Sequence, residues 1–121
     1  MKEGGNIMST SEFFKGYKTA AFWTEEEEIN PDHELSEESE KLMRADTDRF
    51  YEANFQDLQN ISGGWSQAGH DYWLTRNGHG AGFWDLGHGA IGDKLTKYCE
   101  MCGPAHLSDG DTQVHYDVDK W

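Results

Sequence analysis

The chain has 121 residues and carries 23 acidic residues against 10 Lys and Arg, which gives a formal net charge of −13. This length suits one hydrophobic core, so we expect a single domain. Five Trp, five Tyr and six Phe supply the large apolar groups that a disordered chain lacks. No apolar run approaches the ~20 residues that cross a bilayer, and the negative charge repels phosphate backbones. The sequence therefore argues against a membrane span and against direct nucleic-acid binding.

The first predicted element is a helix over residues 9–23. Phe13 and Tyr17 lie at helical spacing behind Ser and Thr residues that can cap the helix. Gly16 lowers the helix propensity of this segment modestly. We expect residues 1–8, which precede the helix, to form a flexible extension.

Residues 24–40 form an acidic segment with nine acidic residues and no Lys or Arg. Asn30-Pro31-Asp32 predicts a turn within it, so we expect a loop or arm. A compact acidic chain can occupy the Lys- and Arg-lined groove of a nucleic-acid-binding protein, and the alternative is that the acidity only aids solubility. The candidate partner-binding residues are Glu25, Glu26, Glu27, Glu28, Asp32, Glu34, Glu37, Glu38 and Glu40.

A second helix is predicted from Ser36 to about Asn60, because Ser36 can cap it and acidic residues in its first turn complement the helix dipole. Its imperfect apolar stripe consists of Leu42, Met43, Phe50, Ala53 and Leu58. The acidic residues expected on its solvent-exposed faces are Asp46, Asp48, Glu52 and Asp57. A second aromatic set, expected at the junction to the next element, is Tyr51, Phe55 and Trp65.

The next predicted elements are a β-hairpin rich in glycine and aromatic residues, followed by a short helix. Residues 70–75 indicate a strand, residues 77–80 tolerate positive φ, and residues 81–85 can return as the partner strand. Asp93 is a plausible N-cap for the short helix, which Gly103 and Pro104 end. The helix face expected to be buried consists of Leu95, Tyr98, Cys99 and Cys102.

The end of the chain predicts a second hairpin. An Asp109-Gly110 turn separates two short runs, and Val114, Tyr116 and Val118 alternate with polar residues. Two N-terminal helices, a hairpin, a short helix and a C-terminal hairpin give an α+β fold for residues 9–121.

Six residues could form a catalytic or metal-binding cluster: His70, Asp71, Arg76, His79, Asp85 and His88. His and Asp can act as a general base with its orienting partner, or as metal ligands. On a strand, however, His70 and Asp71 point to opposite faces, which weighs against an adjacent pair. The structural alternative assigns Arg76 to an ion pair with Asp71 or Asp85. In that alternative, the core of the hairpin contains Trp73, Phe83 and Trp84.

Zinc is the cofactor that the sequence could hold, through Cys99, Cys102, His106 and His115. Both cysteines fall on the apolar side of the predicted helix, where a free Cys packs as a small hydrophobe. We therefore expect no cofactor and core packing for the two thiols, with zinc and then a redox pair as alternatives.

The run AGHDYWLTRNGHGAGFWDLGHGAIGDKLTK resembles a widespread family of small acidic proteins encoded by bacteriophages and related mobile elements, which share a GHDxWLTRNGHGAGFWD block followed by a GDKLT helix. EFFKGYKTAAFW and MRADTDRFYEAN are similar to the first and second helices of that family. The resemblance implies accessory phage cargo in the host cytoplasm and carries no enzymatic activity over to particular residues. It favours a small acidic protein that blocks a host defence or nucleic-acid enzyme by mimicking nucleic acid.

Three functions follow as hypotheses. The first is a binding protein that inhibits or modulates a host protein through the acidic segment. The second is a small enzyme or metal-dependent module that uses the His, Asp and Arg cluster. The third is a structural protein that oligomerises through exposed aromatic residues, with Trp23 and Trp121 as candidates.

Overall fold

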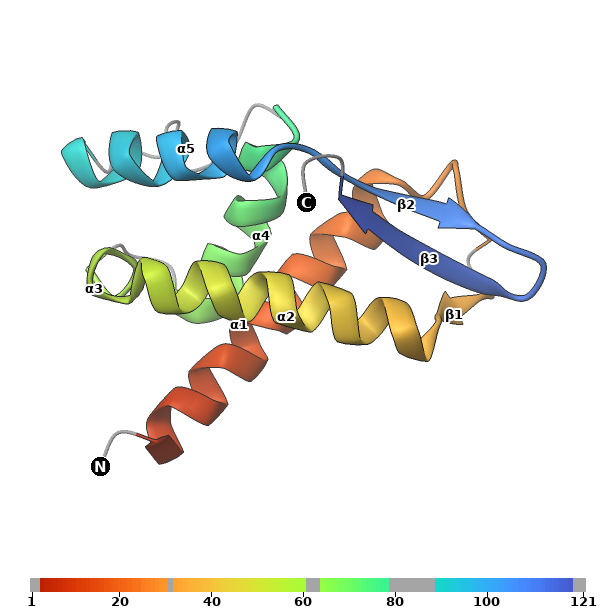
Figure 1. Ribbon diagram of the computed structural model, residues 1–121, viewed down its shortest axis with the longest axis horizontal. Helices are drawn as coiled ribbons and strands as arrows, with labels where there is room; N and C mark the ends of the chain where they lie inside the picture. Colours follow the sequence, from red (N-terminus) through yellow and green to blue (C-terminus); the bar gives the residue numbers. More distant parts are fainter. Residues whose placement is uncertain (1–2, 31, 61–63, 79–88, 119–121) are drawn as a thin grey trace.

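Within the described residues, five helices make up most of the fold, and a small three-stranded sheet lies at one end of them (Figure 1). The computed structural model describes residues 3–30, 32–60, 64–78 and 89–118. The elements are α1 (Glu3–Thr24), β1 (Glu34–Leu35), α2 (Glu37–Ala53), α3 (Phe55–Leu58), α4 (Gly64–Arg76), α5 (Ala90–Cys102), β2 (Ala105–Asp109) and β3 (Gln113–Val118). The predicted α+β class is confirmed. Helix α1 begins before the predicted residue 9 and takes in residues that we assigned to the extension.

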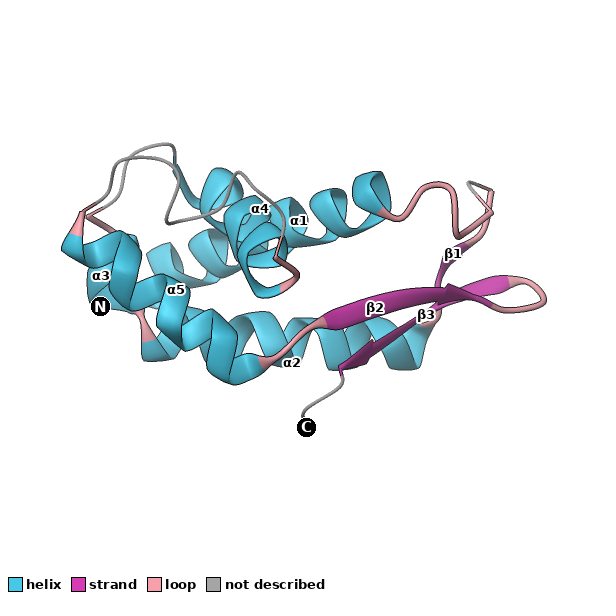
Figure 2. Cartoon of the chain, turned by 90° about the horizontal axis from the view of Figure 1, so that it is seen from above, coloured by secondary structure: helices cyan, strands magenta, loops and turns pink. Residues whose placement is uncertain are grey.

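The helices form two layers, α1 with α4 and α2 with α5 (Figure 2). Helices α1 and α4 approach each other closely because each presents a glycine at the crossing. A Cβ atom added to Gly16 would lie 1.9 Å from the backbone oxygen of Ser66, and one added to Gly69 would lie 1.9 Å from that of Phe13. Packing therefore requires both glycines. This requirement explains why α1 contains Gly16, which otherwise lowers its helix propensity.

Aromatic rings fill the space between the helical layers. Phe50 of α2 stacks on Tyr72 of α4 with ring centroids 4.0 Å apart, and Phe13 of α1 lies 6.0 Å from both rings. Trp73 is buried, as the structural alternative predicts. These rings are fully or almost fully removed from solvent and dominate the apolar area that the core buries.

The predicted start of the second helix is confirmed, whereas its predicted length is wrong. Ser36 caps α2 by accepting a hydrogen bond from the backbone N–H of Ser39 at 3.1 Å. The helix ends at Ala53 rather than near Asn60, because Asn54 leaves helical geometry and its side chain donates to the Phe50 carbonyl. A separate short helix, α3, follows. The aromatic set expected at this junction does pack together there, and its members are Tyr51, Phe55 and Trp65.

The predicted strand at residues 70–75 is wrong, because these residues belong to α4. Residues 68–76 are buried on nearly all sides, with His70 as the half-buried exception, so their burial shows neither the alternation of a strand nor one helical face. The aromatic content of this short run indicated a strand, and packing against α1 overrides that propensity. The partner strand at residues 81–85, with Phe83 and Trp84, lies outside the described residues.

The predicted short helix is confirmed as α5, with an earlier start. It begins at Ala90 after Gly89, so Asp93 lies in the first turn instead of at the cap. Gly103, at φ 77°, ends it as expected. The face predicted to be buried is confirmed: its residues are Leu95, Cys99 and Cys102, with Tyr98 partly buried.

The predicted C-terminal hairpin is confirmed as β2 and β3, which pair antiparallel with Leu107 opposite Tyr116. Val114 and Tyr116 are buried, and the residues that alternate with them, Gln113, His115 and Asp117, are exposed. Strand β1 adds to the other edge of β3 in parallel, giving the order β1-β3-β2. This parallel strand was not predicted, and it attaches the acidic segment to the sheet.

Candidate functional site

The nine candidate carboxylates lie along one continuous path, which we call the acidic surface. Residues 25–28 form the turn after α1, Asp32 and Glu34 lead into and begin β1, and residues 37–40 open α2. Seven of the nine are exposed, and Glu25 and Glu40 are half-buried. The acidic segment is therefore not one loop, since its second half is a strand and a helix start.

Several hydrogen bonds determine the path of this segment. The Trp73 indole N–H donates to the Thr24 hydroxyl at 2.7 Å and ties the end of α1 to α4. The Asn30 side chain accepts from the backbone N–H of Asp32, which forms an Asx turn. His33 Nδ1 lies 2.8 Å from Asp109 Oδ1 at the tip of the hairpin, and this contact lowers the pKa of Asp109. The carboxylates are thus displayed on an ordered backbone.

The positive charges beside the acidic surface converge on one carboxylate. Lys18 Nζ lies 3.6 Å from Glu40, and Arg44 lies 3.8 Å from it while also packing on the Phe14 ring. Within the described part of the chain, the acidic surface makes no other ion pair with Lys or Arg. Within the described residues, eight of the nine carboxylates therefore form no ion pair with Lys or Arg.

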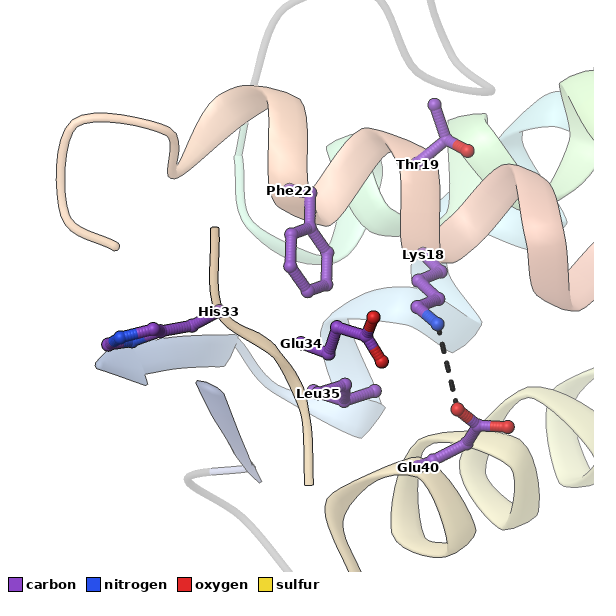
Figure 3. A pocket seen from close by; sticks show the side chains of 7 residues that line it. All are labelled: Lys18, Thr19, Phe22, His33, Glu34, Leu35 and Glu40. Carbon is purple, nitrogen blue, oxygen red and sulfur yellow. Dashed lines mark ion pairs between the residues drawn. The ribbon is translucent and has the colours of Figure 1, made fainter. Parts of the chain in front are cut away.

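A hollow of about 390 Å³ opens between α1 and β1 within the acidic surface (Figure 3). The Phe22 ring and the carboxylate of Glu34 are directed into the space between the two elements, close to Lys18. Its lining residues are Lys18, Thr19, Phe22, His33, Glu34, Leu35 and Glu40. Sequence analysis found the carboxylates of this hollow, while Phe22 and Lys18 were missed.

Two further hollows share lining residues with the first one. One, of about 290 Å³, shares Phe22 and is lined by Phe22, Trp23, Glu26 and Ile29. The other, of about 460 Å³, shares Leu35 and Glu40 and lies at the start of α2. The three hollows follow the acidic surface along the end of α1, β1 and the start of α2, so this face is both charged and recessed.

Three of the six predicted catalytic residues lie on α4, while His79, Asp85 and His88 lie outside the described residues. His70 is half-buried, its ring centroid is 6.0 Å from that of Trp23, and burial lowers its pKa. Asp71 is buried and accepts a hydrogen bond from Gln67, and burial raises its pKa to about 6. Because α4 is a helix, the assignment of His70 and Asp71 to opposite faces of a strand is wrong.

Arg76 pairs with Asp46 of α2, so the alternative pairing with Asp71 is wrong, and the alternative pairing with Asp85 lies outside the described residues. Its guanidinium also donates to the backbone carbonyls of Cys102 and Gly103, at 3.1 and 2.7 Å. Burial lowers the pKa of Arg76, but the neighbouring oxygens of Tyr17, Tyr72 and Asp46 raise it by a larger amount. The net pKa therefore lies above its ordinary value. Arg76 is therefore a charged residue of the core that joins α4 to α2 and to the end of α5.

Three tyrosines complete a buried polar network around this ion pair. The hydroxyls of Tyr72 and Tyr116 donate to Asp46, and the Tyr17 hydroxyl lies 2.7 Å from that of Tyr116. Burial raises the pKa of all three phenols, so they remain neutral donors. We call Tyr17, Asp46, Tyr72, Arg76 and Tyr116 the polar network. It connects α1, α2, α4 and β3.

The expectation that Asp46 lies on a solvent-exposed face of α2 is wrong, because Asp46 is 3% exposed. The sequence did contain a signal that Asp46 is buried. Asp46 follows Met43 by three residues and precedes Phe50 by four, which places it on the apolar stripe. A carboxylate at such a position needs a buried cation, and Arg76 supplies it.

The four candidate zinc ligands lie in different environments. Cys99 and Cys102 are buried on α5, whereas His106 and His115 are exposed on β2 and β3. Burial raises the pKa of both thiols, which disfavours the thiolate that a metal would bind. Within the described ranges, no group of three or more His, Cys, Asp or Glu residues could hold a metal ion.

Comparisons with family models, curated proteins and solved structures gave no match to this chain. None of the helices in the described ranges combines the length and apolar character needed to cross a membrane.

Proposed function

We propose that this chain is a binding protein that uses the acidic surface to engage a basic face of another protein. The single observation that supports this proposal most is the exposure of seven carboxylates on an ordered path whose Lys and Arg ion pairs, within the described residues, all involve Glu40. Such a surface attracts Lys- and Arg-lined grooves, raises the association rate and repels nucleic acid.

The resemblance to small acidic phage proteins supports a more specific form of the proposal. In this form the chain is an accessory protein of a bacteriophage or related element, and it inhibits or modulates a host protein in the host cytoplasm. A defence or nucleic-acid enzyme is the class of target that fits, because its substrate groove is built to bind regularly spaced phosphates. The chain would then occupy that groove as a nucleic-acid mimic.

The test compares two variants with the same net charge. One replaces Glu27, Glu28 and Glu38 with Gln on the acidic surface. The other replaces three exposed carboxylates elsewhere, and these are Glu12, Glu52 and Glu100. Both are used as bait in host lysate at low salt beside the unchanged protein, and association rates are measured for the proteins captured.

The proposal predicts that the unchanged protein and the control variant capture the same basic protein, and that the acidic-surface variant associates with it more slowly. Association should also slow steeply as salt is added, because exposed charges are screened beyond about 10 Å at 0.1 M salt. Equal association rates for the two variants would contradict the assignment of binding to this surface.

A further inference from the structure

The hollow at the end of α1 combines an exposed indole ring with an acidic rim. Its lining residues are Phe22, Trp23, Glu26 and Ile29, and we call it the Trp23 hollow. Trp23 is 59% exposed although its ring packs against His70, whereas Ile29 is only 7% exposed. A large aromatic surface of this kind contributes strongly to protein interfaces when a partner covers it.

The backbone around the Trp23 hollow is fixed before any partner arrives. Glu25 N–H donates to the Ala21 carbonyl at 3.1 Å, and Glu28 N–H donates to the Glu25 carbonyl at 2.9 Å. The hydrogen bond from Trp73 to Thr24 holds the same turn against α4. Glu26 is therefore carried on an ordered turn, which lowers the entropy cost of binding.

The chemistry of the Trp23 hollow selects its occupant. A purely apolar side chain would cover the rim and remove water from Glu26 without giving it a partner. A guanidinium group can stack its plane on an indole ring and donate hydrogen bonds to a carboxylate at the same time. A lysine ammonium is a compact charge that lacks the planar face.

The volume of the Trp23 hollow and the net charge of the chain are consistent with an arginine side chain as the occupant. The Trp23 hollow has about 290 Å³, which is enough room for one long side chain. A second copy of this chain would bring another strongly negative surface against it, because the net charge is −13. The occupant that fits is thus a side chain from a basic segment.

We infer that the Trp23 hollow binds an arginine side chain of the partner, stacked on Trp23 and paired with Glu26. This inference rests on the proposed function and names the residue type that the acidic surface recognises. It assigns to Trp23 a contact that distinguishes arginine from lysine, while the surrounding carboxylates attract both.

The test uses two short blocked peptides, one alternating arginine with serine and the other alternating lysine with serine. Their affinities are measured at about 20 mM salt, where exposed charges are weakly screened. The unchanged protein should bind the arginine peptide more tightly. Trp23→Ala should weaken arginine binding by about fivefold and remove the preference, whereas Trp23→Phe should retain part of it. Met101→Ala, which removes an exposed apolar side chain from α5, is the control and should change neither affinity.

A second measurement on the unchanged protein does not depend on a variant being folded. The indole N–H resonance of Trp23, identified by its loss in Trp23→Phe, should shift with the arginine peptide more than with the lysine peptide. An unshifted resonance, or equal affinities of Trp23→Ala and the unchanged protein, would overturn the inference. So would light scattering that shows a dimer which Trp23→Ala converts to a monomer.

The two proposals fail differently. If the Glu27, Glu28 and Glu38 variant binds both peptides more weakly while Trp23→Ala has no effect, the inference is wrong and the proposed function stands. If Trp23→Ala abolishes the arginine preference while that variant binds both peptides normally, the Trp23 hollow is supported and the wider acidic surface is not.

Discussion

Asp71 is a carboxyl group that the fold buries with incomplete hydrogen bonding. It is 1% exposed, and within the described part of the chain its Oδ2 atom has no hydrogen-bond partner. Burial raises its pKa from 3.8 to about 6. The folded protein therefore holds this proton more tightly than the unfolded chain does, so the group favours folding below about pH 4 and opposes it as the pH rises through 6.

Replacing Asp71 with Asn should accordingly stabilise the protein more at pH 8 than at pH 4. A shift of about two pKa units corresponds to at most about 3 kcal/mol. Urea unfolding of both proteins at the two pH values measures the difference. Asp111→Asn, an exposed substitution, is the control. A stability difference that does not change with pH would contradict this account of Asp71.

The pair of Asp46 and Arg76 makes a second prediction at the residue scale. Both side chains are almost fully buried, so removing either one leaves an uncompensated charge in the core. Asp46→Ala and Arg76→Ala should each lower the free energy of unfolding by about 3–5 kcal/mol, and the double variant should lower it by less than their sum. Denaturant unfolding of the four proteins gives the coupling energy.

A milder variant keeps this test usable if the alanine variants do not fold. Tyr116→Phe removes one hydroxyl that donates to Asp46, and it should cost about 1.5–3 kcal/mol because the acceptor is charged. If the losses of unfolding free energy in the double-mutant cycle are additive, or if Tyr116→Phe leaves the free energy of unfolding unchanged, the polar network does not act as a unit.

At the scale of elements, the crossing of α1 and α4 depends on Gly16 and Gly69. Helix propensity alone predicts that Ala at either position stabilises the protein by about 1 kcal/mol. Packing predicts the opposite sign, because the added Cβ would lie 1.9 Å from a backbone oxygen of the other helix. We expect Gly16→Ala and Gly69→Ala each to destabilise the protein by about 1–3 kcal/mol or more.

Thermal or denaturant unfolding measures this effect, with Lys15→Ala as the control on the exposed side of α1. The control should lie within about 0.5 kcal/mol of the unchanged protein. Glycine variants that are more stable than the unchanged protein would show that the two helices separate without cost.

The same crossing explains why the sequence predicted some elements and missed others. Periodicity identified α1, α5 and the C-terminal hairpin, and the Ser36 cap identified the start of α2, because these signals are local. The run at residues 70–75 is short and aromatic, so its local signal matched a strand. Its helical state depends on Gly69 and Tyr72 packing against distant helices, which no local pattern contains.

The candidate site, like the fold, was predictable only where the signal in the sequence is local. The carboxylates of the acidic surface are evident from the sequence, whereas Phe22, which is separated from the run of glutamates by Trp23 and Thr24, was missed. The recessed shape of this face was not predictable, because it depends on β1 pairing with β3 and on His33 reaching Asp109. These are contacts between residues far apart in sequence.

At the scale of the whole molecule, a net charge of −13 in 121 residues should itself limit stability. Like charges held close together repel one another more in the folded state than in the expanded unfolded chain. Raising salt from about 10 mM to about 1 M shortens the screening length from about 30 Å to about 3 Å. We therefore expect the melting temperature to rise with salt.

The two charge-matched variants show whether this repulsion is concentrated on the acidic surface or spread over the molecule. If it is concentrated, replacing Glu27, Glu28 and Glu38 with Gln should raise the melting temperature at low salt more than replacing Glu12, Glu52 and Glu100. The two melting temperatures should then converge at high salt. Equal responses would show that the repulsion is distributed evenly. A concentrated repulsion is also what a basic partner would relieve, so the variant that melts highest at low salt should be the one that gains least from binding.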